Sequence, residues 1–376
     1  MKMKTTFARP AFWTVFAFYS LIALEFFYMA SPFAAYFYAV YGPQLTIFQH
    51  YPSLAWIGGF FLPHITVATR SPVIDALWPI GAVLASVGFA VFVVCAFCVY
   101  YAKLVRKGLL VGGIYRIVRH PQYAALALCG FGLLLLWPRF LNLAAFVCML
   151  FAYYWLARME ERECVRIYGE GYEKYKAATP MFIPFVKLPS PAFGLRGWKA
   201  FAGQTMLFAA VLTASLTSAR LIRAYSVGEL FHIVGEDYVA VSLVGMDESD
   251  LRRVVALAMA EPSMNRILIE ARYDPHSRFV TYIVPEGFYV SEIPMNEPPN
   301  ASCHPGRKPD AGSAFVVVLA KAVGTRGDER GRAILDAATG LYGLAEVNVD
   351  LKSCHVATVT KAPSKLRYGG LPEPTF

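Results

Sequence analysis

Residues 112–123, GGIYRIVRHPQY, decide how the rest of the chain is interpreted. They lie between two strongly apolar runs and bring tyrosines, two arginines, a histidine and a proline close together. Ionisable groups are costly inside a bilayer, so a cluster of them at the mouth of a membrane helix is a candidate functional site. This stretch therefore predicts a membrane protein with a polar site at one membrane face.

The composition on either side of this stretch supports a membrane protein with a soluble part. Of the 376 residues, 57% are hydrophobic and only 16% are charged, and the mean hydropathy is +0.45. This length has room for two domains. Apolar residues dominate up to about Tyr154 and recur at 200–221, whereas residues 226–376 have the composition of a soluble domain.

The net charge of +9 comes from clusters of Lys and Arg beside the apolar runs. These clusters lie at residues 1–9, 103–107, 116–119, 158–176 and 196–199. Basic loops flanking membrane helices follow the positive-inside pattern and are attracted to anionic headgroups. Nucleic acid is not a predicted partner, because a basic nucleic-acid arm does not normally alternate with apolar helices.

The apolar runs predict about five to seven membrane helices, since roughly 20 residues cross a bilayer. The candidates are residues 11–30, with Glu25 facing the bundle or the interface, a second run to about residue 48, and 54–69, 76–102, 124–137, 140–156 and 200–222. The run 124–137 is roughly 21 Å long as a helix, which is shorter than the hydrocarbon core. Only Pro138 and Arg139 separate it from the next run. We therefore expect a tight helical hairpin whose two ends share one membrane face.

The fold class expected is an all-α polytopic membrane domain followed by a soluble α+β domain. Residues 1–199 would form the membrane domain, 200–222 a final membrane helix and 223–376 the soluble domain. In the soluble part, segments such as YVAVSLV, RFVTYIVP and SAFVVVLAKAV are strand-like, whereas DESDLRRVVALAMA is helix-like. The tetrapeptide DPHS is expected to join two strands as a hairpin turn.

The predicted hairpin returns the chain beside the opening stretch, at ARMEERECVRIYGEGYEKYKAATPMFIP. This segment is expected to begin as a helical extension, to be interrupted at Gly169 and Gly171, and to end at Pro180 and Pro184. A pocket between the two stretches would contain Tyr115, Arg116, Arg119, His120 and Tyr123 on one wall and Glu160, Glu161, Tyr172 and Tyr175 on the other. Carboxylates, cations and aromatic faces suit a ligand with a cationic and an anionic end, such as S-adenosylmethionine. They suit a phosphate site at the membrane surface equally well.

Both motifs resemble those of the membrane methyltransferases, namely the isoprenylcysteine carboxyl methyltransferases and the phospholipid N-methyltransferases. The shared pattern is GxYxxxRHPxY, a hydrophobic hairpin, EExxxxxxxGxxYxxY and a closing P-x-x-x-P, over residues 103–184. Two positions depart from the family pattern: Ala125 replaces a glycine and Cys164 replaces a leucine. These departures bear on the choice of acceptor more than on the cofactor.

The resemblance implies methyl transfer from S-adenosylmethionine to a membrane lipid or a lipidated small molecule or peptide. The acceptor group would be an isoprenylcysteine-type carboxylate or a phospholipid amine. By this resemblance the cofactor would be held by Tyr115, His120, Tyr123, Glu160, Glu161, Tyr172 and Tyr175. Arg119 or Arg158 would orient an acceptor carboxylate, and Glu161 or a neighbour would take the proton of an amine. No metal is expected.

Two other interpretations stay open at this point. Membrane sterol and steroid reductases, which use NADPH, share an RHPxY stretch and a similar tyrosine-rich tail. A non-enzymatic membrane anchor for a sensing or binding tail is the third class. The expected location is a bacterial-type inner membrane, with the cofactor site cytoplasmic and the C-terminal domain on the opposite side.

Cys303 and Cys354 are the only two cysteines of the soluble part, and each precedes a histidine. Adjacent residues of a strand point to opposite faces, which makes two Cys-His pairs poor zinc chelators. Outside the cytoplasm a disulfide between the two cysteines is expected instead.

Overall fold

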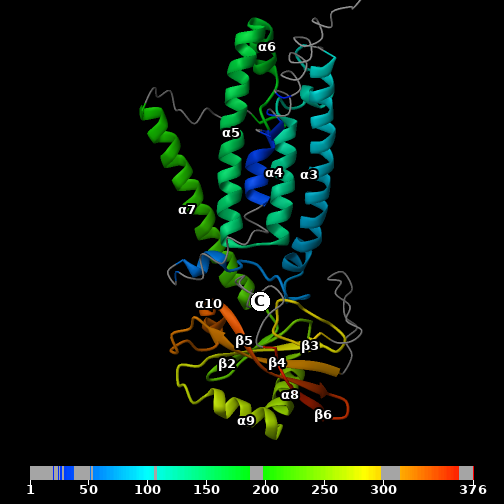
Figure 1. Cartoon of the computed structure of the whole chain (residues 1–376), viewed down its shortest axis with the longest axis vertical. Coiled ribbons are helices and arrows are strands. Elements are labelled where there is room, and N and C mark those ends of the chain that lie inside the picture. The colour runs from blue at the N-terminus through cyan, green and yellow to red at the C-terminus, as the bar shows by residue number, and fades with distance from the viewer. Residues whose placement is uncertain are drawn as a thin grey trace, which may run out of the picture. The chain divides into compact units, whose positions relative to one another are not determined.

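The computed structural model describes residues 20, 24, 26, 27, 29–37, 51, 54–105, 108–186, 198–297, 314–363 and 376 (Figure 1). The helices expected at 11–30 and up to residue 48 lie largely outside these residues, as do Glu25 and Cys303. The chain forms two compact units. The helical unit comprises Met1–Tyr41, Gly81–Leu134 and Ala144–Thr213, and the sheet unit comprises Gly42–Ile80, Leu135–Leu143 and Ala214–Phe376.

Long apolar helices make up most of the described helical unit (Figure 1). In chain order the helices are α3 (Pro72–Leu104), α4 (Pro121–Leu136), α5 (Phe140–Tyr168), α6 (Glu170–Ala178) and α7 (Trp198–Gly228). Among the described residues, α3, α5 and α7 are long and apolar enough to cross a membrane, and α4 is a shorter apolar helix. The helices expected at 76–102, 140–156 and 200–222 are therefore present and are longer than predicted.

Glycines allow α3 and α4 to approach closely. A Cβ added to Gly88 would lie 2.4 Å from the backbone nitrogen of Cys129, and one added to Gly132 would lie 2.3 Å from that of Ala85. Small residues at helix contacts are the usual means of packing helices in membranes. This contact fixes the position of α4, whose first turn carries part of the candidate site.

The predicted hairpin and its helical extension are both present. Leu136 ends α4, Phe140 begins α5, and α5 continues to Tyr168. Gly169 then adopts a φ of 53°, a conformation that glycine adopts without strain. The break at Gly169 lets α6 start in a new direction after α5 (Figure 1).

The sheet unit contains a six-stranded sheet in the order β1-β2-β3-β4-β5-β6. The strands are β1 (His232–Val234), β2 (Tyr238–Ser242), β3 (Phe279–Pro285), β4 (Ala314–Val323), β5 (Gly340–Asp350) and β6 (His355–Lys361). β2 and β3 are parallel, and the other neighbouring strands are antiparallel. One face packs against α8 (Glu248–Ala260) and α9 (Pro262–Ala271). The core on the other face includes Ile65, Leu230 and Phe376, with two residues of α10 (Ala333–Ala337).

The membrane helix expected at residues 54–69 is not formed. This segment contains the short 3-10 helix η1 (Ala55–Gly58) and then runs as a loop. The amide of Val67 donates to the carbonyl of Leu243 at 2.8 Å, and that of His64 donates to the carbonyl of Phe376 at 3.1 Å. The run is apolar because it covers one face of the sheet.

The prediction of a hairpin turn at DPHS is also wrong, because the segment before it forms the helix α9 and not a strand. Glu261 caps α9 by accepting from the amide of Met264 at 2.9 Å, and Pro262 follows the cap. Met264 and Leu268 lie one turn apart and are buried. The helical spacing of the buried residues therefore decides the structure here, although Ile267 and Ile269 favour a strand. The disulfide stays a prediction, since only the exposed Cys354 lies among the described residues.

Candidate functional site

The two stretches predicted to meet are joined by backbone hydrogen bonds. The amide of Arg119 donates to the carbonyl of Pro180 at 2.9 Å, and that of His120 donates to Met181 at 3.1 Å. The 3-10 helix η2 (Gly113–Arg116) leads into this segment, and α4 begins immediately after it. The loop after α6 thus closes against the entrance to α4, next to the last turns of α5.

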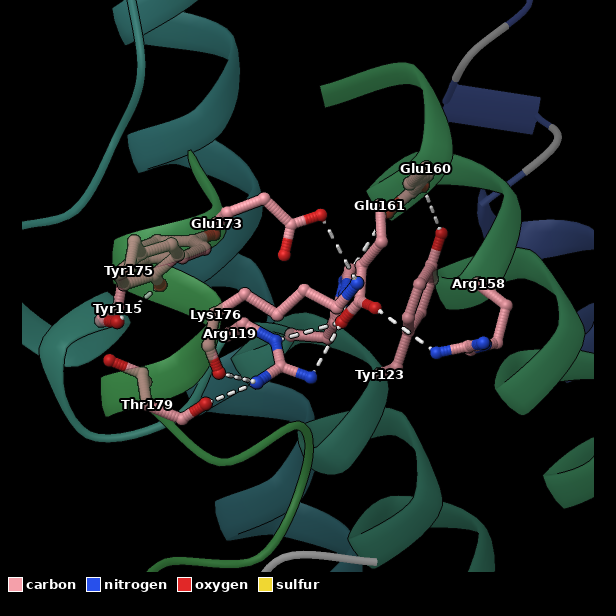
Figure 2. A network of polar contacts seen from close by, with 11 residues as sticks. Tyr115, Arg119, Tyr123, Arg158, Glu160, Glu161, Glu173, Tyr175, Lys176 and Thr179 are labelled. Carbon is pink, nitrogen blue, oxygen red and sulfur yellow. Dashed lines mark hydrogen bonds and ion pairs between the residues drawn. The ribbon is translucent and has the colours of Figure 1, made fainter. Parts of the chain in front are cut away.

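A buried ion pair between Arg119 and Glu161 lies at the centre of the site (Figure 2). The Nε and Nη2 atoms of Arg119 each lie 2.7 Å from Oε1 of Glu161. The side chain of Glu161 is 2% exposed and that of Arg119 is 10% exposed. Nη1 of Arg119 also donates to the carbonyl of Lys176 at 2.9 Å and to that of Thr179. Arg119 therefore binds the carboxylate and the end of α6 together.

His120 lies between the two carboxylates of the Glu pair. Its Nδ1 is 3.3 Å from Oε2 of Glu160, and its Nε2 is 3.5 Å from Oε1 of Glu161. Burial alone would lower the pKa of His120, but the hydrogen bonds and charges of both carboxylates outweigh it and raise the pKa. The imidazole therefore favours its cationic form.

Tyr123 completes this part of the site from the first turn of α4. Its hydroxyl donates to Oε1 of Glu160 (Figure 2). Its ring stacks on His120 at 5.7 Å and on Tyr153 at 4.8 Å between centroids. The aromatic stack fixes both side chains that contact Glu160.

Arg158 and neighbouring charged residues surround a small cavity of about 190 Å³. Its lining residues are Arg158, Glu161, Arg162, Val165, Glu173 and Lys176. Nη1 of Arg158 lies 3.7 Å from Oε2 of Glu161, and the Arg158 side chain is 38% exposed. Three cations and two carboxylates therefore face a space that solvent reaches.

The three other predicted tyrosines lie beside the Glu pair and pack η2 against α6. The hydroxyl of Tyr115 donates to the carbonyl of Cys95 at 3.3 Å, and the hydroxyl of Tyr175 donates to the carbonyl of Tyr115. Tyr172 is buried and its ring lies 5.8 Å from that of Tyr175. Burial raises the pKa of Tyr175 to about 12, against an opposing effect of Arg119.

Several residues of the site were not predicted from sequence. Tyr153 stacks on Tyr123, the ring of Phe182 lies 5.9 Å from His120, and Lys176 and Thr179 accept from Arg119 through their carbonyls. Tyr153 precedes Glu160 by seven residues, so the heptad spacing on α5 was a usable signal. The backbone carbonyls that accept from Arg119 could not be predicted from sequence, because every residue has a backbone carbonyl.

Comparison with known proteins identifies the segment that carries most of this site. Residues 89–171 match the family model described as phospholipid methyltransferase. No curated protein and no solved structure matches the chain. The matched segment contains both RHPxY and the Glu pair, and ends just before Tyr172. Residues 89–171, which carry most of this site, are therefore similar to the phospholipid methyltransferases, a family of integral membrane methyltransferases.

Proposed function

We propose that the protein transfers a methyl group from S-adenosylmethionine to a lipid-borne acceptor at the membrane. The observation that supports this most is the junction of RHPxY with the Glu pair, where Arg119, His120 and Tyr123 all contact Glu160 or Glu161. This junction falls within the residues that match the methyltransferase family. The domain bounds 1–199, 200–222 and 223–376 are part of the same proposal.

The chemistry of the site suits the charged end of such a cofactor. Oε2 of Glu161 is buried and makes no hydrogen bond within the described part of the chain, although Nη1 of Arg158 lies 3.7 Å from it. The adjacent cavity of about 190 Å³ has both cationic and anionic lining groups. A zwitterionic amino-acid end would find an anionic partner in Glu161 and a cationic partner in Lys176. The cavity is smaller than the roughly 300–1,000 Å³ typical of ligand pockets, so only this end would be enclosed.

The residues of the site would act by binding and orientation. Glu160 and Glu161 would hold the ammonium and hydroxyl groups of the cofactor, with His120 and Tyr123 fixing the two carboxylates. Tyr115, Tyr172 and Tyr175 would shape the wall between η2 and α6. A bound S-adenosylmethionine would supply a methyl carbon whose bond to sulfur breaks as its bond to the acceptor forms. Alignment of the acceptor and exclusion of water would then provide most of the rate gain.

The two predicted acceptor-orienting arginines differ in their surroundings. Arg119 is buried and already engaged with Glu161 and two backbone carbonyls. Arg158 is partly exposed and makes one longer ion pair. We therefore assign Arg119 the role of positioning Glu161 and Arg158 that of orienting an anionic group of the acceptor. An amine acceptor would instead pass its proton to Glu161 or Glu160.

Binding of S-adenosylmethionine and of NADPH to the purified protein in nanodiscs tests this proposal. Calorimetry should give saturable binding of the methyl donor and none of NADPH. Tight binding of NADPH without binding of the methyl donor would establish a reductase instead. Binding of neither would favour a non-enzymatic anchor. The acceptor class can then be found with radiolabelled methyl groups and lipid extracts, since carboxyl esters and methylated amines differ in their stability to base.

A further inference from the structure

A second, larger cavity lies within the sheet unit and takes no part in the proposed methyl transfer. Its volume is about 620 Å³, and it is formed by residues 62–67, 69, 74, 75 and 77–79, by residues 135–137 at the end of α4, and by residues 288–292 after β3. All of these residues belong to the same compact unit. The volume lies within the roughly 300–1,000 Å³ of small-molecule sites.

The charged residues that line this cavity are acidic. They are Asp75 and Glu292, and no Lys or Arg occurs among the described lining residues. Oδ1 of Asp75 accepts from the amide of Thr69 at 2.9 Å and from its hydroxyl at 2.8 Å. Oε2 of Glu292 accepts from the hydroxyl of Ser291 at 2.9 Å. These bonds hold both carboxylates in place at the cavity wall.

His64 does not balance the acidic charge. Its ring is stacked between Phe60, at 4.7 Å, and Trp137, at 4.4 Å, and its side chain is only 10% exposed. Burial, followed by the nearby charge of Arg139, lowers the pKa of His64 to about 3. The imidazole is therefore neutral at physiological pH, although Oε1 of Glu292 lies 4.0 Å from its Nε2.

Two polar side chains of the described wall have an atom without a hydrogen-bond partner. Nδ1 of His64 and the hydroxyl of Thr66 are buried and have no hydrogen-bond partner among the residues that the structure describes. The guanidinium of Arg139 is directed elsewhere, since it donates to the carbonyl of Gly58 at 2.6 Å and lies 4.2 Å from the Phe60 ring centroid. Buried polar groups without partners are costly and often mark a ligand site.

The rest of the lining is apolar and combines aliphatic residues with four aromatic ones. Trp78, Trp137, Phe288 and Tyr289 all line the cavity. Aromatic faces attract organic cations, most strongly where the cation is desolvated. We propose that this cavity binds an organic ammonium ion with apolar substituents, its charge facing Glu292 and Asp75 and its substituents facing the aromatic rings.

Other ligand classes fit the wall less well. A carboxylate or phosphate would meet two acidic groups and no lining cation. A bare metal ion is disfavoured because no group of three or more His, Cys, Asp and Glu side chains within the described residues could hold one. A neutral apolar molecule would leave both carboxylates without a counter-charge, and this class is the direct competitor in the test.

The probe is benzyltrimethylammonium, compared with its uncharged carbon isostere neopentylbenzene and with the anion benzenesulfonate. Saturation-transfer NMR with the full chain in nanodiscs, corrected with empty nanodiscs, reports binding. We expect saturable binding of the cation, at least about tenfold weaker binding of the neutral isostere, and none of the anion. Equal binding of the cation and the neutral isostere, or no saturable binding of the cation, would overturn the proposal.

A pair of matched variants locates the site. Glu292→Gln keeps the shape of the wall and removes its charge, so affinity for the cation should fall about tenfold. Glu286→Gln removes an exposed carboxylate that does not line the cavity, and it should leave affinity unchanged. Equal effects of the two variants would show that the cation binds elsewhere. Should the Glu292 variant fail to fold, the comparison of probes on the unaltered chain still decides the outcome.

Discussion

His120 and His64 are both buried, yet their surroundings favour opposite charge states. His120 lies within 3.5 Å of a carboxylate on each side, whereas His64 lies between two aromatic rings and near a guanidinium. The pKa is raised in the first case and lowered to about 3 in the second. Burial alone therefore does not determine the charge of a histidine. At His64 the effect of burial prevails, whereas at His120 two neighbouring carboxylates outweigh it, and the two sites suit ligands of different chemistry.

The strongest test of the first site is Glu161→Gln. This change leaves the buried guanidinium of Arg119 without its counter-ion, and removing one partner of a buried ion pair costs about 3–5 kcal/mol. We expect affinity for S-adenosylmethionine and methyl transfer to fall at least a hundredfold, or about 2.7 kcal/mol. Calorimetry and a radiolabel assay measure the two effects.

The matched control for this variant is Glu163→Gln on the same helix. Glu163 is 51% exposed and pairs with Arg166 at the surface. Its loss should change neither binding nor turnover by more than about twofold. A similar loss in both variants would mean that net charge near the site, and not the carboxylate of Glu161, sustains activity.

The opposite pKa shifts of the two histidines predict opposite pH dependences of stability. The raised pKa of His120 gives a stabilisation that is complete below its ordinary value of about 6.5 and is lost as pH rises through the folded-state pKa. The lowered pKa of His64 gives a stabilisation that is present above about pH 6.5 and is lost as the pH falls toward about 3. Each slope reaches at most about 1.4 kcal/mol per pH unit.

Thermal unfolding of His64→Phe and His120→Gln between pH 5 and 8 measures these slopes. The difference in stability between His64→Phe and the unaltered protein should shrink as the pH falls. The difference in stability between His120→Gln and the unaltered protein should shrink as the pH rises. Slopes of the same sign for both variants would contradict the opposite charge preferences of the two histidines.

Tyr123→Phe is expected to have a smaller effect than Glu161→Gln. It removes the hydroxyl that donates to Glu160 and leaves the stack with His120 and Tyr153 in place. A hydrogen bond to a charged group contributes roughly 1.5–3 kcal/mol, so affinity for the methyl donor should fall about tenfold. Tyr168→Phe, at the exposed end of α5, is the control. An unchanged affinity in Tyr123→Phe would remove Glu160 from the proposed cofactor site.

The smallest effect is expected at the exposed pair of Arg166 and Glu163. Arg166→Ala should lower the free energy of unfolding by no more than about 0.5 kcal/mol, as is usual for surface pairs. Its side chain is 76% exposed. A loss above about 1.5 kcal/mol in chemical denaturation would show that the end of α5 contributes more to stability than its exposure suggests.

The sequence allowed prediction of the contacts that depend on local spacing and on the hairpin. RHPxY and the Glu pair were expected to meet, and Arg119 and Glu161 do so. The same patterns failed for residues 54–69, because an apolar run that covers a sheet has the composition of a short membrane helix. They also gave no sign of the cavity around His64, which joins segments far apart in the chain.

Arg119 links the chemistry of the site to the movement of its closing segment. One guanidinium binds the carboxylate of Glu161 and also the carbonyls of Lys176 and Thr179. A ligand that draws Glu161 toward itself therefore also pulls on the side chain of Arg119 and, through it, on the end of α6. Exchange of a bound molecule and movement of that segment would then be coupled. Covalent restraint of the segment should slow exchange and leave equilibrium affinity less affected.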